Sequence, residues 1–178
     1  MGTVQLNVAV SLDGLIADPD GEGGWLDPFG DDDGRYDRFF AGVGAIVMGA
    51  TSYRWLLDHH EWGYGSVPTW VLTHAPALAD PVDPAADVRP TAAPVGEVLD
   101  AARAAAGDRT VWLFGGGRLA AQFFDAGLVD VVTLTVVPVA LGAGLPLFTT
   151  AVSGLDLESA EVVGRSGRLD LRYAVRRG

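Results

Sequence analysis

Residues Thr110-Val-Trp-Leu-Phe-Gly-Gly-Gly-Arg-Leu-Ala-Ala-Gln-Phe-Phe124 form the stretch that decides the fold. Its mainly apolar first five residues predict a strand buried on both faces, and residues 118–126 predict a helix that Gly127 ends. Glycine lets the backbone approach a ligand closely, and the free N–H groups and dipole at a helix start favour a phosphate. Gly115-Gly116-Gly117 lacks the spacing of the full dinucleotide fingerprint, so the nucleotide site that it indicates needs support from other segments.

Strands and helices alternate on the N-terminal side of this stretch. Residues 4–10 alternate between apolar and polar side chains, which is the pattern of a strand, and Asp13-Gly14 ends it. Pro94 and Gly107 stand in their favoured places before and after a helical pattern. Further apolar runs predict strands at 45–48, at 69–73 and near Val88, and helical spacing predicts helices at 33–41, 50–58 and 94–106.

The C-terminal part contains strands alone. Residues 129–137 are rich in β-branched side chains, and residues 157–163 and 168–176 predict an antiparallel pair that turns at Ser166-Gly167. Strands that alternate with helices and then give way to such a pair indicate an α/β fold with a mixed, mainly parallel central sheet flanked by helices. Because we find no internal repeat and no linker, we expect one domain over residues 1–178.

The composition narrows the classes of partner. Among 178 residues, 23 acidic side chains outnumber 12 basic ones, and the net charge of −11 argues against nucleic acid or an anionic membrane as a partner. The absence of cysteine excludes disulfides, thiolate catalysis and iron–sulfur clusters. The sequence shows no signal-peptide pattern and no run of about 18 apolar residues, so we expect a soluble, cytoplasmic protein that binds a small molecule.

Four segments, taken in their order along the chain, form a further motif set. They are Val10-Ser-Leu-Asp-Gly-Leu-Ile-Ala17, Ala45-Ile-Val-Met-Gly-Ala-Thr-Ser-Tyr53, Val111-Trp-Leu-Phe-Gly-Gly-Gly-Arg-Leu119 and Thr135-Val-Val-Pro-Val-Ala-Leu-Gly-Ala-Gly-Leu-Pro-Leu-Phe148. In this order they resemble the dihydrofolate reductase-like superfamily, above all the reductase domain of bacterial riboflavin biosynthesis and its stand-alone relatives. The resemblance implies a dihydrofolate reductase-like fold and a homodimer. It also implies an NAD(P)H-dependent reductase that transfers hydride to a small heterocycle of pterin or pyrimidine type.

The resemblance also assigns a cofactor site. The dinucleotide would lie across the carboxyl ends of the parallel strands, where an open α/β sheet is expected to bind ligands. Ala50 stands where the family often has an arginine that holds the cofactor phosphates, so NADPH is implied while NADH stays possible. The residues implied to bind the cofactor are Ala9, Gly49, Ala50, Thr51, Ser52, Thr73, His74, Gly115, Gly116, Gly117, Arg118 and Leu119.

The substrate would lie between residues 11–25 and the helix that starts near Asp33. Asp13 and Asp33 are the acids that the resemblance implies as catalytic, able to bind the substrate or to supply a proton. Each has a structural alternative, because Asp-Gly is a common turn and an acid suits a helix N-terminus. Asp13, Trp25 and Tyr53 are the expected substrate-binding residues, since aromatic rings can stack on a planar substrate.

Other functions have some support in the sequence. Dihydrofolate or ribosylaminopyrimidine reduction proper is one alternative, although the acidic stretch 18–22 would repel a phosphorylated substrate. A nucleotide-binding protein without catalysis is another. His59 and His60 are adjacent, so they would point to different sides of a helix, and no second cluster completes a metal site. We therefore expect no metal.

Overall fold

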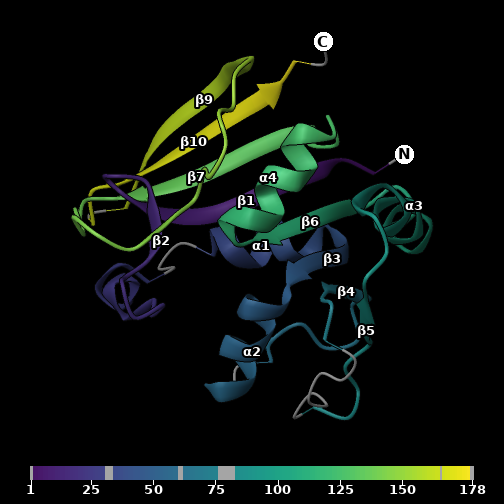
Figure 1. Cartoon of the computed structure of the whole chain (residues 1–178). Coiled ribbons are helices and arrows are strands. Elements are labelled where there is room, and N and C mark those ends of the chain that lie inside the picture. The colour runs from purple at the N-terminus through teal and green to yellow at the C-terminus, as the bar shows by residue number, and fades with distance from the viewer. Residues whose placement is uncertain (1, 31–33, 60–61, 76–82, 165, 177–178) are drawn as a thin grey trace.

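The computed structural model describes residues 2–30, 34–59, 62–75, 83–164 and 166–176, and its centre is an eight-stranded sheet (Figure 1). The strands lie in the order β5-β4-β3-β6-β1-β7-β10-β9. Neighbours from β5 to β7 run parallel, whereas β10 runs antiparallel to both β7 and β9. This arrangement confirms the predicted mixed sheet with a C-terminal antiparallel pair. The strands are β1 (Val4–Ser11), β3 (Val43–Gly49), β4 (Thr69–Leu72), β5 (Val88–Thr91), β6 (Thr110–Gly115), β7 (Val131–Val137), β9 (Leu155–Val163) and β10 (Arg168–Val175).

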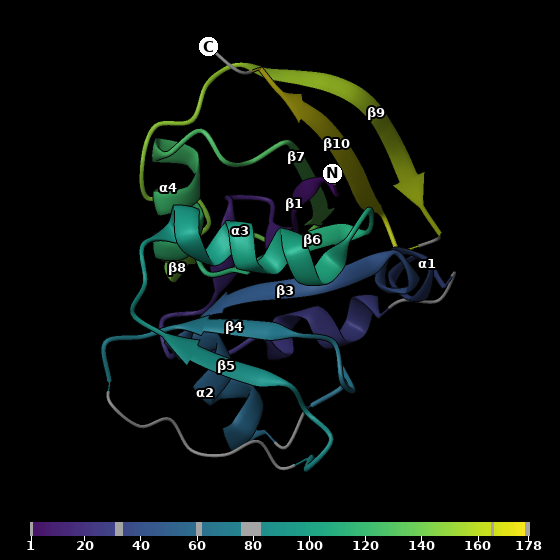
Figure 2. The ribbon, with the colours of Figure 1, turned by 90° about the vertical axis from the view of Figure 1, so that its right-hand side faces the viewer.

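Helices cover both faces of the sheet (Figure 2). On one face, α3 (Val95–Ala106) and α4 (Gly117–Asp125) share a core with Val111 and Leu113 of β6. On the other face, α1 (Arg35–Ala41) and α2 (Ala50–Asp58) pack around Trp112. Successive side chains of a strand point to opposite faces, so the apolar run in β6 serves both cores. No helix in the described part of the chain is long and apolar enough to cross a membrane.

The predicted elements are all present with bounds within two residues of those expected, but three short elements were not predicted. These are β2 (Leu15–Ala17), β8 (Leu145–Pro146) and the 3-10 helix η1 (Gly24–Phe29). β2 and β8 pair antiparallel with each other, and they are too short to show a periodic pattern. Their approach requires Gly144, because a Cβ at that position would overlap the carbonyl oxygen of Ala17.

Candidate active site

The glycine turn joins β6 to α4 at the carboxyl edge of the parallel strands. Gly115 ends β6 with a φ of 106°, the peptide bond to Gly116 is cis, and Gly117 begins α4. A Cβ on Gly117 would overlap the carbonyl oxygen of Pro146 and come within 2.7 Å of that of Leu147. The third glycine is therefore needed for close packing against the end of β8 and the residue after it, as well as for any approach of a ligand.

A second helix starts beside this turn. β3 ends at Gly49, which is the N-cap of α2, and Met48 of β3 pairs in register with Gly115 of β6. The hydroxyl of Ser52 donates a hydrogen bond of 3.5 Å to the carbonyl oxygen of Gly115. Neither α2 nor α4 has a side-chain hydrogen bond at its N-cap. Two helix N-termini thus lie side by side, an arrangement that favours a pyrophosphate.

The remaining residues of the expected cofactor site follow the same edge of the sheet. Thr73 and the exposed His74 come directly after β4, and Ala9 lies near the end of β1. Arg118 is exposed in the first turn of α4. Leu119 differs from the expectation, because its side chain is buried and its N–H donates to the carbonyl oxygen of Gly116. Its side chain and its N–H are thus both engaged within the protein.

A cleft of about 810 Å³ opens on the α1 face of the sheet. Its floor follows from strand register: Ala9 of β1 lies opposite Thr135 of β7, Thr135 opposite Asp170 of β10, and Asp170 opposite Glu161 of β9. Residues directly opposite on neighbouring strands share a face, so these four form one row across the floor. A second row, two residues along, contains Asn7, Thr133, Arg172 and Ser159.

Aromatic rings close the cleft where α1 meets β6. Tyr36 and Phe39 of α1 face Trp112, with ring centroids 6.2 Å and 5.3 Å from it, and Phe114 also lines the cleft. Burial raises the pKa of Tyr36, and the carboxylate of Asp37 adds to this, so the phenol is neutral at physiological pH. Flat apolar walls with a few polar groups are typical of sites for planar ligands.

The acidic stretch 18–22 led us to expect surroundings that repel a phosphorylated substrate, but the cleft is lined by basic as well as acidic side chains. Four arginines line it, Arg35 and Arg38 from α1 and Arg168 and Arg172 from β10, together with the acids Glu161 and Asp170. Two of the loop acids accept hydrogen bonds outside the cleft. Asp18 accepts from the N–H groups of Asp20 and Glu22, and the carboxylate of Glu22 accepts from Trp55 on α2. Residues 18–22 do not line the cleft, so the acidic stretch does not contribute directly to its wall.

Asp13 connects two loops and does not line the cleft. Its carboxylate accepts hydrogen bonds from the Ser11 hydroxyl at 2.6 Å, from the N–H of Gly142 at 2.7 Å and from that of Leu141 at 3.1 Å. These donors, the Ser11 hydroxyl foremost, lower the pKa of Asp13 to about 2. An acid that is ionised and bonded in this way does not supply a proton at neutral pH, so the structure favours the alternative of a structural Asp-Gly turn.

The other predicted substrate residues have different outcomes. Tyr53 does not line the cleft, because its side chain is 0% exposed and packs with Trp62 in the α2 core. Trp25 lies half-buried in η1 but does not line the cleft, to which its neighbour Leu26 contributes. Asp33, like His60 in the metal argument, lies outside the described residues. Within the described residues, no three His, Cys, Asp or Glu side chains form a group that could hold a metal.

The sequence argument missed the polar floor of the cleft. Gln5 and Asn7 fit the polar half of an alternating strand, and Thr133 lies among β-branched strand residues that carry no charge. Yet β1 and β7 are interior strands of the sheet, and Gln5 is only 8% exposed. Interior strands usually carry apolar side chains on both faces. Polar residues at every second position of such a strand were therefore the signal that could have indicated a polar site.

The fold and the arrangement of this site define a dihydrofolate reductase-like α/β protein. A dihydrofolate reductase from Enterococcus faecalis, solved as a complex with NADP(H), matches with a TM-score of 0.66 over 97% of this chain and 95% of its own, at 15% identity. A structure described as a putative riboflavin biosynthesis protein from Shewanella sp. PV-4 matches with a TM-score of 0.78 at 26% identity, over 99% of this chain and 100% of its own.

Sequence comparison narrows this class to one family. The family model described as the RibD C-terminal domain matches residues 50–166, and the chain belongs to this family. The uncharacterized protein YwjB of Bacillus subtilis is 31% identical over 173 residues, which cover 92% of this chain and 94% of that protein. The chain therefore combines the RibD C-terminal domain family with a dihydrofolate reductase-like fold.

Proposed function

We propose that the protein is an NAD(P)H-dependent reductase that acts on a small planar heterocycle bound in the α1 cleft. The observation that carries this proposal is that the cleft and the glycine turn adjoin each other at the end of β6. Phe114 lines the cleft, and the next residue, Gly115, begins the glycine turn between the two helix N-termini. A dinucleotide on that turn can therefore reach the cleft. Membership of the RibD C-terminal domain family supports the same reaction class.

The residues at the carboxyl edge fit a dinucleotide. The first turns of α2 and α4 offer N–H groups that no side chain caps, and Gly49 and Gly116 present little bulk beside them. Ser52 and Thr51 add hydroxyl groups to the first turn of α2. A bound reduced nicotinamide would supply the hydride, which is chemistry that the protein alone lacks.

The protein's own residues orient the substrate and exclude water. Asp13 holds the segment after β1 against residues 141–142, and Leu26 of η1 covers the cleft beside Ala9. Gln5, Asn7 and the threonines of β7 provide polar groups on the floor, while the rings of α1 and β6 supply flat walls. Fixing the reacting groups in one geometry removes part of the entropic barrier of the reaction.

A second candidate is the reduction of a phosphorylated ribosylaminopyrimidine. The four arginines of the cleft favour it, because guanidinium groups bind phosphate well. The two candidates differ in a single measurable property, which is whether a phosphate on the substrate improves kcat/KM.

Titration with NADPH and with NADH, followed by nicotinamide fluorescence and by Tm, tests the first step. A ligand that binds only the native state must raise Tm, so saturable binding of either dinucleotide supports the proposal. Absence of binding by both would overturn it. Cofactor oxidation with a panel of pterins and pyrimidines then separates an enzyme from a protein that binds nucleotide without turnover.

A further inference from the structure

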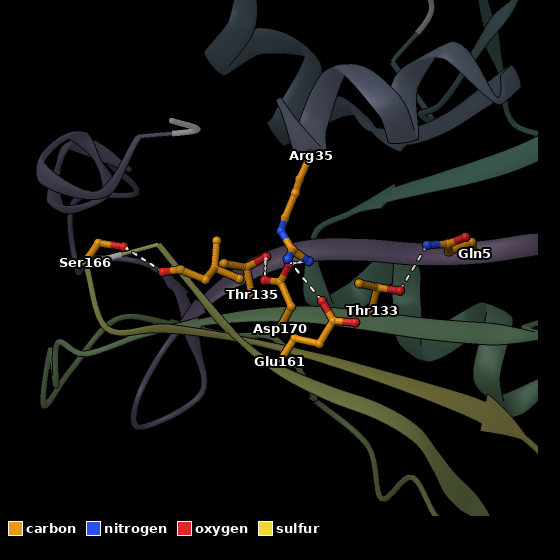
Figure 3. Close-up of polar contacts among 8 residues, drawn as sticks. Gln5, Arg35, Thr133, Thr135, Glu161, Ser166 and Asp170 are labelled. Atoms are coloured by element: carbon orange, nitrogen blue, oxygen red, sulfur yellow. Dashed lines mark hydrogen bonds and ion pairs between the residues drawn. The ribbon is translucent and has the colours of Figure 1, made fainter. Parts of the chain in front are cut away.

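Asp170 has the best-defined polar surroundings in the cleft (Figure 3). It lies near the start of β10, where its two register partners are Thr135 on β7 and Glu161 on β9. The hydroxyl of Thr135 donates a hydrogen bond of 2.7 Å to Asp170 Oδ1. The side chain of Asp170 is 19% exposed, so its carboxylate is mostly shielded but still reaches the cleft.

Arg35 of α1 divides its guanidinium between two carboxylates on the far side of the cleft. Its Nη2 lies 3.0 Å from Glu161 Oε2, whereas its Nη1 lies 3.3 Å from Asp170 Oδ2. The contact with Glu161 is the shorter one and lies nearer to solvent, since the Glu161 side chain is 56% exposed. Because Glu161 is a second carboxylate partner, Arg35 can lose its contact with Asp170 and still be paired with an acid.

Asp170 keeps capacity for a ligand in this arrangement. An ionised carboxylate has about four acceptor positions on its two oxygens, and Thr135 and Arg35 use one each. Two neighbouring N–H donors on a planar ligand match a carboxylate as two parallel hydrogen bonds. Aromatic walls on the α1 side, Tyr36 and Phe39 among them, suit the ring that would carry such donors.

We propose that Asp170 is the residue that determines which ring the cleft accepts, by binding a heterocycle with a ring N–H beside an exocyclic amino group. Thr135 fixes the carboxylate, and Arg35 is the counter-ion that the ligand displaces. Because it concerns the substrate of the reductase, the assignment rests on the proposed function. The assignment specifies which edge of the substrate is recognised, the one with the two N–H donors, and it places the recognising residue on β10.

The test uses 2,4-diaminopyrimidine as the probe and 2,4-dimethoxypyrimidine, which has no N–H donor, as the matched control compound. Binding is measured by calorimetry and by tryptophan fluorescence on the wild-type chain and on Asp170→Asn. We expect the diamino probe alone to bind, and Asp170→Asn to weaken it about tenfold or more, as loss of a hydrogen bond to a charged group does. The control variant is Asp156→Asn. Asp156 lies on the edge strand β9 and pairs with exposed Arg176 just after β10, so this variant should bind the probe as the wild type does.

Equal affinity of wild type and Asp170→Asn, or no binding of the diamino probe to the wild type, would overturn the assignment. Arg35→Gln is a second test that does not depend on the folding of Asp170→Asn. Removal of a displaceable competitor should tighten binding of the probe, whereas a merely structural Arg35 would leave it unchanged or weaken it. Titration with NADPH alone reports on the reductase proposal separately, because that titration does not involve Asp170.

Discussion

The carboxylate of Asp13 accepts a hydrogen bond of 2.7 Å from the backbone N–H of Gly142, which lies 129 residues later in the chain. With the bond from Leu141, this contact fastens the segment after β1 to the loop after β7. The N–H of Leu12 donates to the carbonyl oxygen of Val139 in the same region at 2.7 Å. Asp13 therefore acts in the described structure as a connection between two loops that border the cofactor edge.

Replacement of Asp13 by Asn should change the dependence of stability on pH. The pKa of Asp13 is about 2 in the folded protein against an ordinary 3.8, so its stabilising effect is complete above about pH 4 and is lost as the pH falls through 2. We expect Asp13→Asn to have a lower Tm at pH 7 and a shallower fall of Tm between pH 4 and pH 2. Thermal unfolding across this range checks both.

Asp100→Asn controls for the loss of one negative charge, since Asp100 is exposed on α3. The same shallow acid profile in this variant would show that net charge alone causes the effect. The pH dependence of kcat/KM, measured with a substrate found in the proposed screen, gives a further check. If Asp13 only positions loops, Asp13→Asn should lower kcat/KM at every pH and leave the shape of the profile near neutral pH unchanged.

Local signals in the sequence were sufficient for most of the fold. α3 was predictable because Pro94 and Gly107 mark its two ends, and β6 because its apolar run has no polar interruption. The pairing of β2 with β8 was not predictable, because it depends on Gly144 passing close to Ala17, a contact between distant parts of the chain. Short elements that form only in tertiary context leave no periodic pattern.

The two halves of the candidate site were predictable to different degrees. The glycine turn is contiguous in sequence, so its position beside a helix start could be read directly. The cleft floor takes residues from each of four strands, as the row from Ala9 to Glu161 through Thr135 and Asp170 shows. Only the strand order brings these residues together. The argument from aromatic stacking considered residues one at a time and led to Tyr53, whose side chain is buried.

Gly117→Ala should destabilise the protein and disturb the cofactor edge. The new methyl group would overlap the carbonyl oxygens of Pro146 and Leu147, and backbone atoms cannot move aside as a flexible side chain can. We expect a loss of about 1–3 kcal/mol in the free energy of unfolding, as in other overpacked sites. Gly96→Ala in α3 is the matched control, because a Cβ there meets nothing within 4 Å. That variant should be about 0.5–1 kcal/mol more stable, and equal effects of both would contradict the packing argument.

Arg118→Gln should weaken dinucleotide binding without a change in stability. The residue is exposed in the first turn of α4, next to the turn that we assign to the pyrophosphate. We expect NADPH and NADH to lose affinity by a similar factor of about three to ten, since an exposed charge contributes modestly. Fluorescence titration at two salt concentrations checks this, with Arg176→Gln as the control. Loss of NADPH affinity alone would instead place Arg118 at the phosphate that distinguishes the two cofactors.

Glu22→Gln should loosen the loop that carries the cleft-lining Leu26. Glu22 Oε2 accepts from Trp55 Nε1 at 2.9 Å and lies 3.2 Å from His59 Nε2, while the other ring nitrogen of His59 lies 2.8 Å from the carbonyl oxygen of Trp55. Because the pair is exposed, we expect backbone amide exchange in residues 18–30 to become about two to five times faster. Hydrogen–deuterium exchange of peptides from residues 18–30 measures this rate. Glu97→Gln, a substitution on α3, is the control. An equal change in the control would show that the contact between Glu22 and Trp55 does not anchor the loop.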